Sequence, residues 1–309
     1  MLKRAGDEWN KINGVLTMPE RFNISYSKSE VKNFLHTDFT SYCSSMNIPF
    51  YSFRENMKDP IIIDQIKSWE PDLIIAVGWY HMIPKCIRTI PKYGVIGMHA
   101  SFLPNYRGGA PLVWAIINGE KEVGISLFYI EKGVDTGDIV EQSKTTVNLN
   151  DTIKTVYEKI ETLGKELLIK NVPLILKGVS KRKQQNYLQT KIWPQRSPKD
   201  GIIDWSCHSL EIYNYIRAQT KPYPGAFSFY KGEKLIVWEA KLYDFYNSQV
   251  NKGGIILDII NNEIVSGILI STNNQDTPLL VTQVNYEEKD YKAVEFSKRY
   301  RVKIGECLE

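Results

Sequence analysis

Two side chains that can transfer a proton follow two apolar segments of the chain. His99 comes directly after the apolar run 94–98, and Asp135 comes after the run 124–130, inside the sequence Gly-Val-Asp-Thr-Gly. An imidazole accepts a proton at neutral pH, and a carboxylate beside it fixes its tautomer and stabilises its charged form. The two residues therefore predict general acid–base chemistry at a common site.

Two alternatives accompany this hypothesis. A single histidine beside an apolar run can be a hydrogen-bonded structural residue, and Asp138 could supply the carboxylate instead of Asp135. No serine or cysteine stands in a Gly-x-Ser-x-Gly turn, so a covalent nucleophile on the protein is not indicated. A base without a protein nucleophile suits direct attack by a substrate amine on an activated acyl donor.

The surrounding elements indicate an α/β fold. Apolar, β-branched runs alternate with helix-like stretches, which predicts βα units and a mostly parallel, Rossmann-like sheet. The runs are 14–18, 73–77, 94–98 and 124–130, and the helix-like stretches include 60–69 and 111–118. Ligands bind at the carboxyl edge of such a sheet, where His99 and Asp135 would lie.

The second half of the chain has a different pattern. Asp151 can cap a helix that runs to about Lys177, with an apolar stripe suited to packing on the sheet. Residues 180–198 are polar and irregular, and short alternating strands follow them, which predicts a small β-barrel. We expect a catalytic domain at 1–179, a linker at 180–198 and a C-terminal barrel domain at 199–309.

Composition narrows the class of protein. No run of eighteen apolar residues and no signal-peptide core occur, so we expect a cytoplasmic protein without a membrane partner. The four cysteines form no Cys-x-x-Cys pair, which indicates neither a disulfide framework nor a metal site. A net charge of +4 suits anionic ligands but falls short of a dedicated nucleic-acid binder.

Several motifs resemble the signature of the 10-formyltetrahydrofolate-dependent formyltransferases. The central ones are HASFLPNYRG at 99–108, NGE at 118–120 and GVDTG at 133–137. The likeness continues in PDLI at 71–74, HMIP at 81–84, DGIIDWS at 200–206, PYPGAF at 222–227 and YRVKIGE at 300–306. It therefore covers nearly the whole chain.

This resemblance implies the reaction and its residues. In the family a formyl group passes from 10-formyltetrahydrofolate to a primary amine, and the histidine and aspartate that act together match His99 and Asp135. The pterin would lie against the backbone of two segments that comprise His81, Met82 and Ile83, and Glu131, Lys132, Gly133, Val134 and Asp135. No metal is implied.

The loop after His99 is expected to line the substrate site. Its candidate residues are Ser101, Pro104, Tyr106 and Arg107. Ser101 and Pro104 would shape the donor pocket rather than react. Arg107 would either hold a phosphate or carboxylate through a bidentate contact, or tie the loop down by donating to backbone carbonyls.

Two departures from the family pattern stand out. The family has an asparagine two residues before the histidine, thought to hold the developing oxyanion, whereas this chain has Gly97. Loss of such a donor costs about 10²–10³-fold in rate, unless a backbone amide, a water or Asn105 replaces it. The family also has a strand, a loop and most of a helix before a strand like residues 12–18, where this chain has only MLKRAGDEWNK. We expect an upstream start, an altered sheet edge, or association with another chain, such as a homodimer.

Two classes of acceptor amine compete. The segment 19–42 has scattered charges of both signs and no basic cluster, which favours the amine of a nucleotide-linked amino sugar over methionyl-tRNA. The motifs Gly78-Trp79-Tyr80 and 221–227 also resemble the sugar-nucleotide members, and aromatic side chains there could pack on a sugar or base. Methionyl-tRNA is the alternative acceptor. A catalytically impaired relative that only binds folate or a nucleotide sugar is the third possibility.

Overall fold

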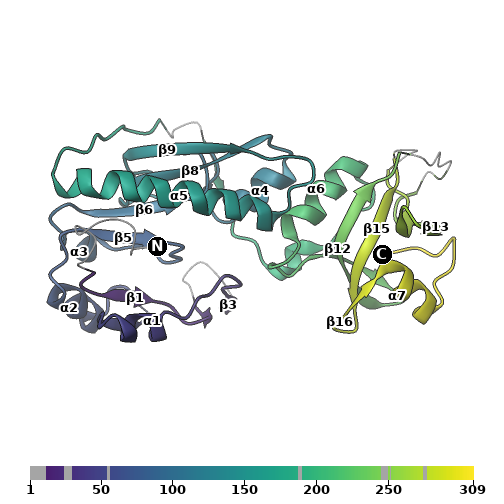
Figure 1. The fold of residues 1–309 in the computed structure, drawn as a ribbon, viewed down its shortest axis with the longest axis horizontal. Helices are drawn as coiled ribbons and strands as arrows, with labels where there is room; N and C mark the ends of the chain where they lie inside the picture. Colours follow the sequence, from purple (N-terminus) through teal and green to yellow (C-terminus); the bar gives the residue numbers. More distant parts are fainter. Residues whose placement is uncertain are drawn as a thin grey trace. The chain divides into compact units, whose positions relative to one another are not determined.

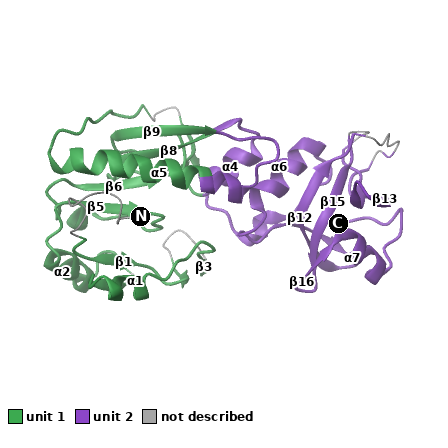
Figure 2. Ribbon diagram, in the orientation of Figure 1, with its two compact units in different colours: residues 1–109, 123–145, 159–193 green, residues 110–122, 146–158, 194–309 purple. Residues whose placement is uncertain are grey.

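The computed structural model describes residues 12–23, 30–53, 56–186, 190–244, 250, 252–273 and 277–309. The chain divides into two compact units, and neither is continuous in sequence (Figure 2). The first comprises 1–109, 123–145 and 159–193, and the second comprises 110–122, 146–158 and 194–309. The expectation about the first strand concerns residues 1–11, which lie outside the described residues. The boundaries 1–179, 180–198 and 199–309 remain a proposal.

The first unit is built on short β-strands and helices, as Figure 1 shows. A four-stranded sheet has the order β5 (Ile74–Val77), β6 (Val95–His99), β8 (Glu122–Tyr129) and β9 (Ile139–Thr146). A parallel pair joins β1 (Val15–Thr17) to β4 (Phe50–Ser52), and β2 (Arg21–Phe22) pairs with β3 (Val31–Lys32). The helices are α1 (Thr40–Ser45), α2 (Pro60–Ser68) and α3 (Lys85–Arg88).

Strand direction in this sheet is mixed. β5 and β6 are parallel, as expected, but β8 runs antiparallel to β6 and places Gly97 opposite Phe128. A central strand is apolar on both faces whichever way it runs, so periodicity does not reveal its direction. The predicted α/β class is confirmed, with this one reversal.

The long helix α5 (Ile153–Leu176) begins and ends close to its predicted bounds. The members of its apolar stripe that are buried are Ile153, Val156, Ile160, Leu167 and Leu168. Gly164 in this helix lies so near β6 and β8 that a Cβ there would stand 2.3 Å from Met98 Cε and 2.9 Å from Ile125 Cδ1. Because side chains alternate along a strand, α5 covers the face that carries Met98, and His99 points to the opposite face. In the described ranges, no helix is long and apolar enough to cross a membrane.

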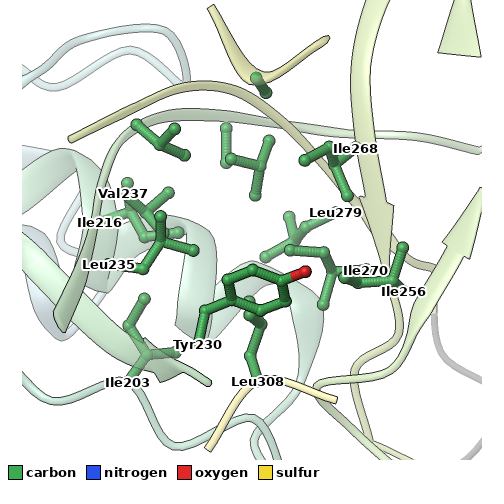
Figure 3. Close-up of a cluster of buried hydrophobic side chains, with 14 of the residues drawn as sticks. Ile203, Ile216, Tyr230, Leu235, Val237, Ile256, Ile268, Ile270, Leu279 and Leu308 are labelled. Atoms are coloured by element: carbon green, nitrogen blue, oxygen red, sulfur yellow. The ribbon is translucent and has the colours of Figure 1, made fainter. Parts of the chain in front are cut away.

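The second unit contains a six-stranded antiparallel sheet around a hydrophobic core. Its strands are β11 (Ala226–Tyr230), β12 (Glu233–Leu242), β13 (Ile256–Asn261), β14 (Ser266–Ile270), β15 (Leu279–Tyr286) and β16 (Lys289–Lys292). Its helices are α4 (Pro111–Ile117), α6 (Ser209–Gln219) and α7 (Ala293–Tyr300). Tyr230 is 1% exposed and lies among the aliphatic side chains of this core (Figure 3).

The last residues of the chain close this sheet into the predicted small barrel. Glu309 and Phe229 of β11 exchange both backbone hydrogen bonds, at 2.8 and 2.9 Å. On the other side Leu308 donates to the carbonyl of Gly254 at 2.8 Å, next to β13. The tail therefore occupies the position between the two edge strands, and the Leu308 side chain, 4% exposed, packs into the core.

Candidate active site

The parallel strands β5 and β6 bring two predicted segments to one edge of the sheet. Val77, the last residue of β5, is in register with Met98, so His99 ends β6 where the chain leaves β5 towards His81. This is the carboxyl edge, where open α/β sheets bind their ligands.

His99 and Asp135 come together at this edge. Nδ1 of His99 is 3.7 Å from Oδ2 of Asp135, and Nε2 of His99 is 2.8 Å from the carbonyl oxygen of Tyr106. A carbonyl oxygen only accepts, so Nε2 carries the proton of the neutral ring and Nδ1 presents its lone pair towards Asp135. A proton taken up by Nδ1 would thus lie between the imidazole and the carboxylate.

The backbone holds Asp135 in this position. Its φ is +51°, in the left-handed region, and its Oδ2 accepts a 2.8 Å hydrogen bond from the Gly108 N–H. At Gly137 a Cβ would lie 1.7 Å from the carbonyl oxygen of Tyr129, so only glycine fits there. Asp138, the alternative carboxylate, pairs with Tyr129 through its backbone carbonyl, and the contact with His99 comes from Asp135.

The loop after His99 is tightly folded. Ser101 is buried and its Oγ donates to the carbonyl of Asn105 at 2.6 Å, while Pro104 follows a cis peptide bond. Tyr106 and Ala110 have φ values of +54° and +48°. Left-handed residues other than glycine cost about 1–3 kcal/mol each and cluster at functional sites. Ser101 and Pro104 thus lie where they shape this loop.

Arg107 is buried, and each of its three guanidinium nitrogens donates a hydrogen bond within the protein. Its Nε donates to Thr190 Oγ1 at 3.2 Å, Nη2 donates to the Thr190 carbonyl at 3.0 Å, and Nη1 donates to the Val134 carbonyl at 3.3 Å. The guanidinium joins the loop after His99 to the loop that carries Asp135. These contacts support the alternative in which Arg107 ties the loop down.

Residues of the expected linker also belong to this site, and sequence reasoning missed them. The buried Gln185 donates through Nε2 to the carbonyls of Asp135 and Gly137, at 3.0 and 2.6 Å. Strand β10 (Ile192–Trp193) pairs in parallel with β7 (Arg107–Gly108). Trp193 could have been noticed because it is a tryptophan within a polar segment. Nothing in the sequence distinguishes Gln185.

The space beside Gly97 is filled by apolar atoms. A Cβ at Gly97 would lie 3.0 Å from Ile130 Cδ1 and 3.2 Å from Phe128 Cε1. Gly97 shares the face of β6 with His99, so these side chains occupy the direction that a longer side chain would take. Asn105 is exposed, and its backbone carbonyl is bound by Ser101.

The segment expected to bind the pterin contains polar atoms that lack a partner. The His81 ring lies 5.1 Å from Phe53 and 6.1 Å from Trp79 between ring centroids, and burial lowers the pKa of His81, so the ring is neutral at pH 7. Within the described part of the chain, His81 Nε2 and Trp79 Nε1 are buried without a hydrogen-bond partner. Unpaired buried polar atoms are costly, so these groups fit a planar ligand that carries hydrogen-bonding atoms. Beside them Met82 is exposed and Ile83 is buried.

The described residues hold no group of three or more His, Cys, Asp or Glu side chains suited to a metal ion. His99 ends β6, and Asp135 lies in the loop between β8 and β9.

Comparisons with known proteins agree with this description. Residues 20–172 match the formyl transferase family, and residues 196–301 match its C-terminal domain. A methionyl-tRNA formyltransferase of Fusobacterium nucleatum is 34% identical over 279 residues, covering 90% of this chain and 87% of the relative. That of Clostridioides difficile is 32% identical over 308 residues, covering 99% and 95%.

A solved structure shares the fold. WlaRD, a sugar 3N-formyl transferase determined with dTDP and 5-N-formyl-THF, has a TM-score of 0.54 at 21% identity, covering 81% of each chain. The chain belongs to the formyltransferase family. It is a formyl-transferring enzyme.

Proposed function

We propose that this enzyme transfers the formyl group of 10-formyltetrahydrofolate to the α-amine of methionyl-tRNA, with His99 as the base and Asp135 as its partner. The observation that carries the chemistry is the 3.7 Å approach of His99 Nδ1 to Asp135 Oδ2, with His99 Nε2 bound to the Tyr106 carbonyl oxygen. The acceptor is supported by two relatives of that name, which align with 90% and 99% of the chain.

The two side chains account for the proton balance of the reaction. The amine nitrogen bonds to the formyl carbon as its proton passes to His99 Nδ1, and Asp135 stabilises the resulting imidazolium. The bond from the formyl carbon to N10 of the folate then breaks, and N10 takes the proton back from the His99 imidazolium, which restores the neutral base. The products are a formamide and tetrahydrofolate.

The oxyanion must be held without a side chain at residue 97. Ile130 and Phe128 fill that space, so a hydrogen bond to the oxyanion would come from a backbone amide, a water or another side chain such as Asn105. We therefore expect slower turnover than in family members with asparagine at this position, by about 10²–10³-fold if nothing replaces the donor.

A nucleotide-linked amino sugar is the second candidate acceptor, and the charges near β2 and β3 favour it. Arg21 pairs with Glu30 at 3.3 Å, and Lys32 pairs with Glu20 at 3.2 Å. In the described residues of this segment, 19–23 and 30–42, basic side chains are thus balanced by acidic ones. Binding of a nucleic-acid backbone requires several uncompensated cations.

The acceptor can be tested directly. Purified protein is supplied with 10-formyltetrahydrofolate and either methionyl-tRNA or a panel of nucleotide-linked amino sugars, and the products are measured by mass spectrometry. We expect formylmethionyl-tRNA with the wild type and far less of it, in the same time, with His99→Ala. Formylation of an amino sugar alone would replace the first acceptor by the second. Folate binding without any turnover would contradict both and indicate a binding protein.

A further inference from the structure

We propose that Tyr106, Trp193 and Lys191 form a subsite for the nucleobase and adjoining phosphate of the acceptor. This inference rests on the proposed function, since both candidate acceptors carry a nucleotide next to the part that bears the amine. The base is the terminal adenine in methionyl-tRNA, or the base of the nucleoside diphosphate in an amino sugar nucleotide.

The Trp193 ring contacts both of the other side chains. The Tyr106 and Trp193 rings stack with centroids 5.0 Å apart and planes inclined by 20°, and Lys191 Nζ lies 3.5 Å from the Trp193 ring centroid. Both rings are partly exposed and Lys191 is exposed. Aromatic faces on which bases stack, together with a nearby cation, are the usual means of binding single nucleotides.

The lysine can give way to a base. Its ammonium group sits on a long, flexible and exposed side chain, so moving it away from the ring costs little. When a base takes its place against Trp193, Lys191 remains within reach of the attached phosphate. The same residue thus covers the ring in the free protein and neutralises charge in the complex.

The backbone of this subsite is rigidly joined to the loop after His99. Gly109 donates to the carbonyl of Trp193 at 2.9 Å, and Arg107 donates to Thr190 through both Nε and Nη2. Gly108 has a φ of +99°, and a Cβ there would stand 2.4 Å from the Trp193 carbonyl oxygen, so the close approach requires glycine. A platform held in place before the ligand arrives loses little entropy on binding.

The platform is also directly linked to the proposed base. The carbonyl of Tyr106 accepts from His99 Nε2 at 2.8 Å, and Gly108 donates to Asp135 at 2.8 Å. A nucleotide stacked on Trp193 therefore lies next to the loop that orients the proton-transferring pair.

Kinetics of Trp193 variants test the inference. Removing one stacked base contact costs about 1–3 kcal/mol, so Trp193→Ala should raise the KM for the acceptor by about 5- to 150-fold. The KM for 10-formyltetrahydrofolate should stay unchanged, and Trp193→Tyr should retain most of the acceptor affinity. If Trp193→Ala does not fold, Trp193→Leu keeps the apolar bulk without the stacking face. The matched control is Trp238→Ala, since Trp238 also has a lysine over its ring, Lys221 at 4.9 Å, in the second unit.

A binding experiment separates this inference from the proposed function. Tryptophan fluorescence is measured while AMP or UDP is added, with wild type and Trp193→Tyr compared. Saturable quenching that needs Trp193 supports the subsite, even if no acceptor is formylated. Tighter binding of AMP indicates the terminal adenosine of tRNA as the ligand, and tighter binding of UDP indicates a sugar nucleotide. Active enzyme whose acceptor KM is unchanged in Trp193→Ala, or wild type that neither nucleotide quenches, would overturn the subsite and leave the proposed reaction intact.

Discussion

His99 donates from Nε2 to the carbonyl oxygen of Tyr106 over 2.8 Å, and this bond decides which nitrogen of the ring can act as a base. The proton on Nε2 is held by an acceptor that cannot itself donate, so the lone pair lies on Nδ1. Tyr106 has a left-handed φ of +54°, which aims its carbonyl at the ring. The strained backbone of the loop thus has a chemical purpose.

We therefore expect the neutral His99 ring to be the Nε2–H tautomer. The ¹⁵N chemical shifts of the imidazole, recorded at a pH where the ring is neutral, should show a protonated Nε2 and an unprotonated Nδ1. The ¹⁵N shifts of His208, which lies in the second unit, are recorded in the same sample for comparison with those of His99. Protonation of Nδ1 in the neutral ring would contradict the arrangement.

Gln185 should matter for both stability and rate. Gln185→Leu leaves the carbonyls of Asp135 and Gly137 without their donor, so we expect a loss of about 1–3 kcal/mol in the free energy of unfolding. The loop that carries Asp135 would also loosen, which should lower kcat. Urea unfolding and steady-state kinetics measure the two effects. Gln195→Leu is the control, since Gln195 is exposed in the same segment. Equal effects of the two variants would contradict the role of Gln185 in holding the loop that carries Asp135.

Restoring an amide at residue 97 should require a second change. In Gly97→Asn the new Cβ would press on Ile130 and Phe128, and overpacking of this kind costs about 1–3 kcal/mol of stability. Adding Ile130→Ala opens the space, so the double variant should regain stability relative to Gly97→Asn alone and should exceed its kcat. Thermal unfolding and kcat are measured for wild type, Gly97→Asn and the double variant. A single variant as stable as wild type would show that the space is not filled.

The closure of the barrel by the chain end predicts a strong effect at a site far along the sequence from His99. Leu308→Ala removes a side chain that is 4% exposed in the core of the second unit, so we expect a loss of about 2–5 kcal/mol. Ile304→Ala is the matched control, because Ile304 is 64% exposed and should change stability by less than about 0.5 kcal/mol. Chemical denaturation of both variants measures this difference, and similar values would contradict the role of the tail.

Much of the fold and the central pair were predictable from the sequence. The period of apolar residues located β6 and α5, and the motifs around His99 and Asp135 placed both at strand ends, where the structure brings them within 3.7 Å. The direction of β8 was not predictable, because an apolar strand looks the same in either direction. The contribution of Gln185 depends on a buried backbone contact between residues 48 positions apart, which no local pattern encodes.

The sequence analysis and the comparisons favour different acceptors. Scattered charge in the segment 19–42 and the aromatic residues near Trp79 favoured an amino sugar, whereas the relatives that align with most of the chain are methionyl-tRNA formyltransferases. Arg21 and Lys32 of this segment form ion pairs with glutamates, so their charges are compensated and the segment does not favour phosphate binding. These ion pairs say less about the surroundings of His99, where the acceptor amine of the proposed reaction must arrive.

The most direct test of the account is the rate of formyl transfer from 10-formyltetrahydrofolate in wild type, His99→Ala, Asp135→Asn and the double variant, with Asp138→Asn as control. Asparagine tolerates the left-handed backbone at residue 135, so the loop should persist. We predict that each single variant at the pair loses about 10²–10⁴-fold in kcat, that the double variant loses no more than the worse single one, and that Asp138→Asn stays near wild type. Wild-type rates in either His99→Ala or Asp135→Asn would contradict the assignment of this pair as the proton-transferring centre.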